Sequence, residues 1–565
     1  MEQKWILLDD HPTEDVQRLA TELNMPPVLV KVLFNRGVRS YDEAKRFFRP
    51  EFSSLNDPFQ LPEMDVAAER LLEAVRKRER VLIYGDYDVD GITSVALLYR
   101  FLRKLGVPTD FYVPDRIAEG YGLSERGVRE AVDRGAQLLI TVDCGVTAHR
   151  EVALARQLGL DVIVTDHHEP TDDLPPAQAV IDPKRKDSTY PFKELAGVGV
   201  AFKLLQALVH KTRSSMDALH EGLDLVAIGT AADIVPLVDE NRTLVKMGLE
   251  RLSRTPNVGL RALLEVVGLL RKDITTGHIV FILAPRINSV GRLGSAERAV
   301  HLLITSNAQQ ARNIASILDS ENRQRKSIDE QTFREAVQIV EEEFDPVTTR
   351  SLVLALEGWH PGVIGIVASR LVERFYRPTV MISLDGGIGK GSARSIPGFD
   401  LYDALKQCSD LMIDFGGHRY AAGLSIAQEN IPEFRRRFNE IASAKLTDDQ
   451  LVPKLRIDAE LNLDDVDGRF YTLLKLFGPF GPQNMRPVFV SRNLEVVGAP
   501  TVVGNNHLKF RVRQRSRVFE AIGFNLGDMI YRIEPGRKNL DLAYVIDENH
   551  YMGVTTLQLR VKDLR

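Results

Sequence analysis

The chain has 565 residues, 44% hydrophobic and 27% charged, with a formal net charge of −5. This length predicts roughly three or four domains with cores of their own. The net charge excludes a uniformly basic nucleic-acid coat, although it leaves room for local basic patches. The two cysteines, Cys144 and Cys408, exclude a disulfide framework and any multi-cysteine zinc or iron–sulfur site.

Residues 1–49 read as a polar, mixed lead-in. They lack the basic segment followed by an apolar run that marks a signal peptide. No apolar run of the chain reaches transmembrane length. We therefore expect a cytoplasmic protein of a reducing compartment that does not associate with membranes.

From about residue 66, short apolar runs alternate with helical patterns. The runs at residues 81–84 (VLIY), 138–143 (LLITVD) and 161–166 (DVIVTD) predict strands, as does FYVP at 111–114. Strands separated by amphipathic helices are typical of a doubly wound parallel sheet, and we predict this α/β fold for residues 50–305. Such sheets bind ligands outside the carboxyl ends of their strands.

Residues 85–91, GDYDVDG, place Asp86, Asp88 and Asp90 directly after the first of these strands. The same pattern opens a calcium-binding EF-hand loop. That loop needs a preceding helix and a glutamate at position 12, where this chain has Leu97. Turn aspartates, or capping of the next helix by Asp90, would explain one or two of the carboxylates. Three together favour a bound cation.

Further acidic and histidine residues follow other apolar runs: Asp143, Asp166 with His167 and His168, and Asp233. We interpret all of these runs as strand ends that meet at one edge of the sheet and form a metal site. Oxygen ligands suit Mg²⁺ or Mn²⁺, and the imidazole favours Mn²⁺. At least five candidate ligands indicate two ions. Ions about 3.5–4 Å apart are the device for in-line hydrolysis of phosphate esters.

Residues 306–344 predict one helix, roughly 55 Å long, with Ser306 and Asn307 available as caps. Its middle, residues 319–327, is polar nearly all round, which is typical of a helix that bridges two lobes through solvent. Residues 345–445 resume an α/β pattern in a smaller unit. The many short strand-like runs of residues 446–565 predict an all-β barrel.

Cations occupy alternate positions in HLKFRVRQRSR: Lys509, Arg511, Arg513, Arg515 and Arg517. On a strand they would form one face, with Leu508, Phe510 and Val512 on the other. An ordinary solvated face is the plain alternative. The absence of an acid within this basic face favours a track for a phosphate backbone. The pattern does not place an aromatic platform for bases.

Arg394 lies in the glycine-containing loop KGSARSIPG, flanked by Ser392 and Ser395. A guanidinium beside hydroxyl and backbone N–H groups can clasp a phosphate. A solvated turn fits the same residues equally well.

Ten segments in order resemble the DHH phosphoesterase superfamily and, within it, the bacterial exonucleases specific for single-stranded DNA. They are GDYDVDG, VPDRIAEGYGLS, VDCG, TDHH, LAGVGVAFKLL, ADIVPL, APRINSVGR, EGWHPGVIGIVASRL, KGSARSIPG and GGHRYAAG. The resemblance covers residues 50–565. It implies a DHH domain (50–305), a connecting helix (306–344), a DHH-associated domain (345–445) with the active site between the lobes, and a nucleic-acid-binding OB-fold barrel (446–565).

The resemblance also implies an activity. The enzyme would degrade single-stranded DNA from its 5′ end to 5′-mononucleotides with two Mn²⁺ or Mg²⁺ ions, in DNA repair and recombination. It would act as a monomer whose partners are single-stranded DNA, a single-strand-binding protein and a helicase.

Carried over by position, the resemblance implies the metal ligands Asp88, Asp90, Asp143, His167 and Asp233, with Asp143 between the ions. Asp86 would orient the loop or bind through water. His168 would face the scissile phosphate and share the catalytic role with Asp143. The implied phosphate and DNA contacts are Arg116, Arg286, Ser392, Arg394, Ser395, His418, Lys509, Arg511 and Arg513; His360 is a weaker candidate that also fits a structural role. Tyr84 stands where related pyrophosphatases carry a histidine, which predicts weaker binding of one ion.

Two other functions stay open at this point. One is a DHH phosphodiesterase for oligonucleotides, cyclic dinucleotides or pyrophosphate; such enzymes resemble the first two lobes but lack the β-barrel. The other is a catalytically inactive scaffold that binds single strands. Such a scaffold would have lost metal ligands, whereas this chain keeps the full set except at the position of Tyr84.

Overall fold

The computed structural model describes residues 3–8, 10–116, 118–345, 347–551 and 553–565. The chain forms two compact units: Pro285–Lys454 with the N-terminal end up to Lys4, and Trp5–Ala284 with Leu455–Arg565. Within the described ranges, no helix has the length and apolar character needed to cross a membrane.

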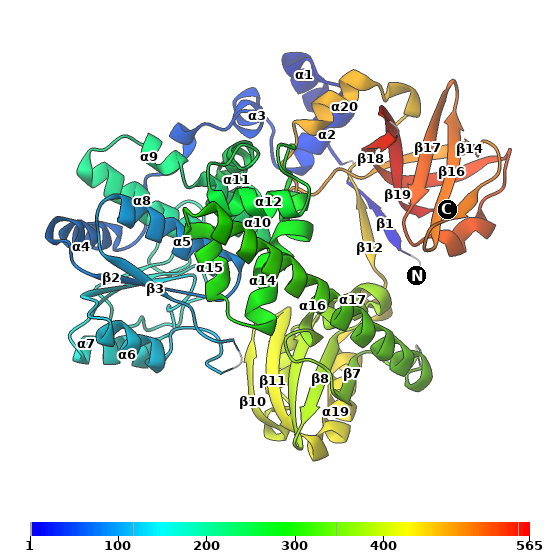
Figure 1. Ribbon diagram of the computed structural model, residues 1–565. Helices are drawn as coiled ribbons and strands as arrows, with labels where there is room; N and C mark the ends of the chain where they lie inside the picture. Colours follow the sequence, from blue (N-terminus) through cyan, green and yellow to red (C-terminus); the bar gives the residue numbers. More distant parts are fainter. Residues whose placement is uncertain (1–2, 9, 117, 346, 552) are drawn as a thin grey trace. The chain divides into compact units, whose positions relative to one another are not determined.

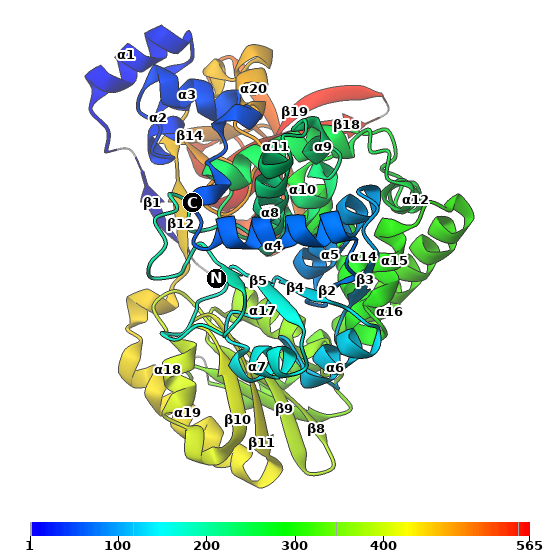
Figure 2. The ribbon, with the colours of Figure 1, turned by 90° about the vertical axis from the view of Figure 1, so that its left-hand side faces the viewer.

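The unit that contains Trp5–Ala284 is built around a five-stranded parallel sheet. Its order is β3-β2-β4-β5-β6, with β2 (Val81–Gly85), β3 (Thr109–Tyr112), β4 (Leu138–Val142), β5 (Asp161–Thr165) and β6 (Ala179–Ile181). Helices α4 (Met64–Lys77), α5 (Val89–Lys104) and α8 (Gly197–Thr212) cover one face, and α6 (Glu125–Asp133) and α7 (His149–Gln157) the other (Figures 1 and 2). Both central strands, β2 and β4, are buried throughout. The predicted doubly wound sheet is confirmed.

Further helices follow the sheet in this unit: α9 (Asp217–His220), α10 (Leu223–Ala232), α11 (Asp239–Leu252), α12 (Val258–Val266), α13 (Thr276–His278) and a π-helical turn (Ile279–Leu283). The next two helices along the chain, α14 (Ala284–Leu293) and α15 (Glu297–Ile304), belong to the unit that begins at Pro285. The interpretation of Asp233 as a strand end is wrong, because Asp233 is the C-cap of α10. This helix is buried from Leu223 to Ala231. A helix that is apolar all round has no amphipathic period, so its sequence resembles a buried strand.

The N-terminal segment is more than a lead-in. It forms α1 (Thr13–Leu23), α2 (Pro27–Asn35) and α3 (Tyr41–Phe48), and Leu29, Val30 and Leu33 are fully buried in one core with the C-terminal strands. Strand β1 (Lys4–Leu7) pairs with β12 (Lys454–Ile457). The segment reads as polar because the amphipathic α1 and α3 bury only a narrow apolar stripe.

The C-terminal strands form the predicted barrel. Its sheet runs β13-β14-β18-β19-β17-β16-β15, and pairing of β14 with β16 joins its two sides. The strands are β13 (Ala459–Glu460), β14 (Phe489–Val496), β15 (Thr501–Val503), β16 (His507–Gln514), β17 (Arg517–Gly523), β18 (Lys538–Tyr551) and β19 (Val554–Leu564); helix α20 (Gly468–Lys475) precedes β14.

The other unit contains a mixed sheet of order β10-β11-β9-β8-β7. Its strands are β7 (Leu352–Glu357), β8 (Thr379–Asp385), β9 (Ile388–Arg394), β10 (Met412–Gly417) and β11 (Ala421–Ala427). Helices α16 (Ala308–Glu343) and α17 (Ile364–Phe375) pack on one face; α18 (Leu401–Lys406) and α19 (Ile431–Lys445) pack on the other. The smaller α/β unit is thereby confirmed.

The long helix α16 begins where the sequence predicts. The Asn307 side chain accepts hydrogen bonds from the N–H groups of Gln309 and Gln310, so Asn307 rather than Ser306 is the cap. The prediction of a middle that is solvated nearly all round is confirmed only in part, because most side chains of residues 319–327 are exposed but Asn322 and Arg325 are buried. They and the buried Asp329 just beyond satisfy one another's polar groups, and Arg370 of α17 also bonds Asp329.

Candidate functional site

The three aspartates after β2 have different surroundings. Asp88 caps α5, since its Oδ1 accepts the N–H groups of Asp90 at 2.8 Å and Gly91 at 3.1 Å. The capping considered for Asp90 therefore belongs to Asp88. The carboxylate of Asp90 instead accepts the N–H groups of Gly197 at 2.6 Å and Val198 at 2.9 Å, at the start of α8. Asp86 is buried, and its Oδ1 has no hydrogen-bond partner among the described residues.

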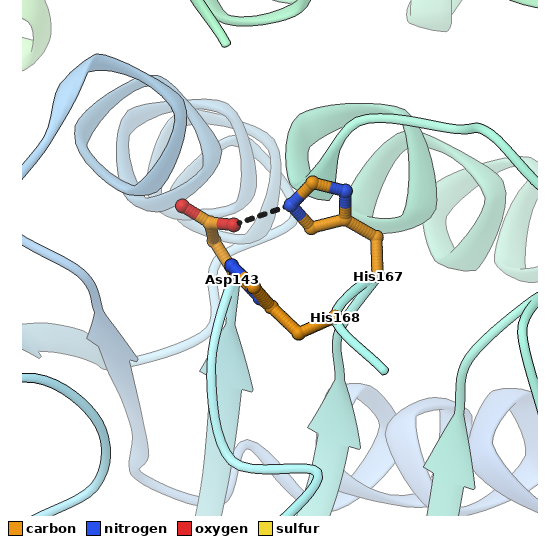
Figure 3. A group of neighbouring side chains, drawn as sticks. All are labelled: Asp143, His167 and His168. Atoms are coloured by element: carbon orange, nitrogen blue, oxygen red, sulfur yellow. Dashed lines mark ion pairs between the residues drawn. The ribbon is translucent and has the colours of Figure 1, made fainter. Parts of the chain in front are cut away.

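Asp143, His167 and Asp233 meet beside these aspartates. His167 Nε2 lies 3.1 Å from Asp143 Oδ1 and 3.6 Å from Asp233 Oδ2. Figure 3 shows the Asp143 carboxylate and the His167 ring turned toward each other. All three atoms are buried, and none makes a hydrogen bond to another described residue. Such crowding of buried, unpartnered acceptors calls for a bound cation.

The backbone is strained at two of these positions. Asp143 has a φ of 59°, and Ile234, which follows Asp233, has a φ of 63°. The left-handed region is costly for residues other than glycine, most of all for a β-branched one, and such outliers cluster at functional sites. Asp233 also places a carboxyl group at the C-terminal end of α10, where the helix dipole disfavours its ionised form.

The candidate ligand atoms fall into three groups, each with its atoms within 4.8 Å of one another. The groups are Asp86, Asp88 and Asp143; Asp90, His167 and Asp233; and Asp143, His167 and His168. Asp143 belongs to two of them, one of which contains Asp86. A carboxylate in this position can contact two ions.

The electrostatics of the site favour a cation. Burial, followed by repulsion from neighbouring aspartates, raises the pKa values of Asp86, Asp143 and Asp233 well above their usual range. The same causes raise the pKa of Asp90 to about 7. Burial, with the charge of His168, lowers the pKa of His167 to about 3, so its imidazole is neutral and can offer a lone pair. The donor set of carboxylates plus one neutral imidazole fits Mn²⁺ or Mg²⁺.

His168 is held by Asp166. Its Nδ1 lies 2.7 Å from Asp166 Oδ1, which also accepts the N–H groups of His167 and His168. The second oxygen, Oδ2, accepts the Val146 N–H at 2.9 Å. Burial opposes ionisation of Asp166, but its hydrogen bond to His168 and the charge of that ring lower its pKa. Burial likewise opposes charging of His168, yet the bond to Asp166 raises its pKa. Asp166 thus orients the half-buried His168.

Tyr121 was missed by the reasoning from sequence. Its hydroxyl donates to the Asp143 carbonyl oxygen at 3.2 Å and lies 2.9 Å from His168 Nδ1. The available signal was its place between two glycines in EGYG. Gly120 and Gly122 have φ values of 80° and 95°, a backbone conformation that favours glycine on both sides of Tyr121.

Tyr84, the departure from the pyrophosphatase pattern, has a structural role. Its buried hydroxyl donates to the Gly122 carbonyl oxygen at 2.8 Å and accepts the Ser124 N–H at 3.2 Å. Its ring stacks on Tyr112 with centroids 5.4 Å apart. Tyr84 therefore anchors the loop that carries Tyr121. Arg116, at the start of this loop, lies over the Tyr87 ring at 5.0 Å from its centroid.

In the other unit, Arg394 and Ser392 lie at the start of α17. Arg394 Nη1 donates to Ser392 Oγ at 3.2 Å and to the Ala393 carbonyl oxygen at 2.7 Å. A Cβ added to Gly365, in the first turn of α17, would lie 2.7 Å from Ser392 Oγ and 3.1 Å from Arg394 Nη2. A helix N-terminus, a hydroxyl and a guanidinium together suit an anion. The Ser395 hydroxyl instead donates to the Phe399 carbonyl oxygen at 2.9 Å.

The other residues of this unit that were predicted to contact phosphate or DNA lie in three separate places. Arg286 Nε and Nη2 each lie 2.9 Å from Asp319 Oδ1. His418 is exposed in the turn between β10 and β11. The ring of His360 accepts the Gly362 N–H at 3.0 Å, which supports the structural role considered for it.

The basic strand of the barrel differs in part from its prediction. Lys509, Arg511 and Arg513 lie on the outer face of β16, opposite the buried Leu508, Phe510 and Val512, as the alternation predicts. However, Arg515 lies in the turn with a φ of 53°, and Arg517 begins β17. The face is also not free of acids, because neighbouring strands supply them. Arg513 lies 2.5 Å from Glu495, and Lys509 lies 3.5 Å from Glu520.

Three domain profiles match the chain. The DHH family N-terminal domain matches residues 80–230, the DHHA1 domain residues 348–444 and the RecJ OB domain residues 457–563. The single-stranded-DNA-specific exonuclease RecJ of Bacillus subtilis is 40% identical over 556 residues, which span 98% of this chain and 70% of the relative. The RecJ of Salmonella typhimurium is 38% identical over 562 residues, 96% of either chain.

A solved structure agrees with these relatives. RecJ of Thermus thermophilus, in a crystal structure with Mn²⁺, matches with a TM-score of 0.86 and 31% identity. The match covers 100% of this chain and 79% of the Thermus chain. The ordered domains, the identity along the chain and the shared fold confirm the resemblance seen in the motifs: this chain belongs to the RecJ family within the DHH superfamily.

Proposed function

We propose that this chain is a metal-dependent exonuclease that degrades single-stranded DNA from its 5′ end and releases 5′-mononucleotides. The observation that carries the proposal is the crowding of buried, unpartnered carboxylate oxygens around the neutral His167. The relatives support the substrate, since they are named single-stranded-DNA-specific exonucleases. The manganese complex of the Thermus thermophilus enzyme supports the cofactor.

We assign the ligands of two Mn²⁺ or Mg²⁺ ions to Asp88, Asp90, Asp143, His167 and Asp233, with Asp143 shared. Asp86 stands in the same group as Asp88 and Asp143 and is a sixth candidate. When bound, the ions supply an activated water and neutralise charge on the phosphate. Asp90 is held by two backbone N–H groups and Asp143 by its fixed backbone, so the chain presents both carboxylates with little freedom.

His168 acts on the scissile phosphate in this proposal. Asp166 holds its Nδ1 and favours the protonated ring, which presents a positive charge and a hydrogen-bond donor. Tyr121 also limits the movement of this ring, since its hydroxyl lies 2.9 Å from the same nitrogen and the two ring centroids are 5.4 Å apart.

Other residues of the chain bind DNA in this proposal. Ser392 and Arg394, with the start of α17, receive the 5′-terminal phosphate. The outer face of β16 follows the strand backbone. Additional contacts are assigned to Arg116, Arg286, Ser395, His418, Lys509, Arg511 and Arg513.

The cellular setting belongs to the same proposal. The relatives are bacterial, and bacterial DNA lies in the cytoplasm, so we place the activity there. We further propose that the chain acts as a monomer in DNA repair and recombination, alongside a single-strand-binding protein and a helicase. The resemblance of the motifs supports these assignments.

The test is digestion of end-labelled single- and double-stranded DNA, with and without a 5′ phosphate, in Mn²⁺ or Mg²⁺. We expect nucleotide release from the single strand, none from Asp143→Ala, and unchanged strand binding by that variant. Asp172→Ala, which removes an exposed carboxylate beyond β5, is the control and should digest normally. Normal digestion by Asp143→Ala would refute the metal assignment. Cleavage of dinucleotides alone would favour the phosphodiesterase, and binding without cleavage the inactive scaffold.

A further inference from the structure

Two aromatic rings lie side by side on the outer face of the barrel. His507 begins β16, and Phe524 directly follows β17, so the antiparallel register that pairs Leu508 with Gly523 brings them together. Their ring centroids are 5.0 Å apart at an interplanar angle of 65°. Phe524 is 44% exposed, although a phenylalanine has no polar group that solvent would favour. A large apolar ring left in solvent at this position invites a stacking partner.

A guanidinium completes this pair. Arg560 Cζ lies 4.9 Å from the centroid of the Phe524 ring. Arg560 belongs to β19, the parallel neighbour of β17, and pairs with Ile522 in the register. The His507 ring is also fixed, since its Nδ1 accepts the Asn525 N–H at 3.2 Å. The three side chains thus come from β16, β19 and the residue directly after β17, and are held by the sheet and by one another.

The charges around the cluster suit a polyanion. Arg560 makes no ion pair with a carboxylate among the described residues. Lys509 lies two positions beyond His507 on the same outer face and pairs with Ile522 in the register. Lys509 forms an ion pair with Glu520, and Arg513 forms one with Glu495, so the charges of these two cations are partly neutralised. The basic face alone therefore offers less attraction for phosphates than its sequence indicates.

We propose that Phe524, His507 and Arg560 form a stacking site for an unpaired nucleobase of the single-stranded DNA substrate. This inference rests on the proposed function and assigns the aromatic platform that the sequence pattern does not reveal. Every base has a π-face, so a ring flanked by an imidazole and a guanidinium accepts any base. Duplex DNA buries those faces in its own stack, so the site would contribute to the preference for single strands.

The test uses the full chain and a fluorescein-labelled single-stranded 20-mer of deoxythymidine in a chelator, so that no hydrolysis accompanies binding. We expect Phe524→Ala to weaken binding about tenfold, within the range of roughly 5- to 150-fold typical of losing one stacked base. Phe524→Trp should restore it. Val518→Ala is the matched control, because Val518 is 47% exposed on the same face of β17 but pairs with Arg513 at the other end of the strand.

A second strand isolates the base contact. An abasic strand of equal length keeps the phosphates but offers no π-face, so wild type and Phe524→Ala should bind it equally. Arg560→Lys should weaken binding to the normal strand, because lysine keeps the charge but loses the planar group.

Equal binding of the normal strand by wild type and Phe524→Ala would overturn the inference, as would equal losses on both strands. If the wild-type chain bound no single strand at all, the proposed function itself would fail, which is a different outcome.

Discussion

Replacing Gly197 by alanine probes how closely the start of α8 is packed against the metal cluster. A Cβ at this position would lie 2.7 Å from both Cβ and Oδ1 of Asp143. Carbon atoms in good contact are about 3.5 Å apart or more, so one side must move by roughly 0.8 Å. Asp143 cannot give way easily, because its φ of 59° is already strained and its carbonyl oxygen is bound by Tyr121.

The expected result follows from that displacement. A shift near 1 Å in a catalytic group costs roughly 100-fold in rate, so kcat in Mn²⁺ should fall by about that factor. The overpacking should also lower the free energy of unfolding by about 1–3 kcal/mol. Steady-state digestion of a 5′-phosphorylated single strand and denaturant unfolding measure the two effects.

Gly199→Ala is the control in the same helix. The three atoms nearest to its added Cβ all belong to the Leu195 side chain, the closest at 3.3 Å, and that chain end can rotate away. Both variants add the same methyl group to α8. If Gly197→Ala kept the wild-type kcat while folding normally, the close packing of α8 on Asp143 would have no part in positioning the ligand.

Three further predictions concern protons and charges. The raised pKa of Asp90, about 7 against 3.8, means that the metal-free folded chain holds a proton that the unfolded chain loses above about pH 4. In the presence of a chelator, the melting temperature of the chain should therefore fall as the pH rises from about 4 to 7, and added Mn²⁺ should oppose this fall. A melting temperature that rose with pH in the chelator would contradict the repulsion described for the site. Asp166→Asn should lower kcat about 10- to 100-fold with strand binding unchanged, because His168 loses the negative charge that favours its protonated ring, although an amide oxygen can still accept from its Nδ1. An unchanged kcat would remove Asp166 from that role. Glu495→Gln should release Arg513 from its ion pair and strengthen the binding of single-stranded DNA at low salt. In a log–log plot of the binding constant against salt concentration, the slope should become steeper by less than one unit. An unaltered slope would show that Arg513 does not contact the DNA backbone.

Much of the site could be predicted because its residues follow the rules of a parallel sheet. Asp86 and Asp143 come directly after short apolar strands, His167 is the second residue after another, and parallel strands bring their carboxyl ends to one edge. Asp233 lies beside His167, as the predicted ligand set requires, although the prediction misread its surroundings. A buried helix such as α10 and a buried strand both have an all-apolar sequence, so the pattern does not tell them apart. The prediction that Asp233 is a ligand did not depend on this distinction, because it rested only on an acidic residue that follows an apolar run.

The alternation of β16 shows the limit of such reasoning. Periodicity correctly assigned Lys509, Arg511 and Arg513 to one face, because successive side chains of a strand point to opposite sides. It could not reveal Glu495 and Glu520, since strand pairing brings these acids from distant parts of the chain. The same pairing brings Arg560 over Phe524.

By itself, the sequence determined the strands of the parallel sheet, the long helix α16 and the chemistry of the ligands. Local periodicity marks strands and helices, and residue type decides which atoms can hold a cation. Only the tertiary structure decided that the start of α8 holds Asp90, that Tyr84 anchors the loop of Tyr121, and that the N-terminal helices complete the core of the barrel. Each of these depends on contacts between residues far apart in the chain, which no local pattern of side chains encodes.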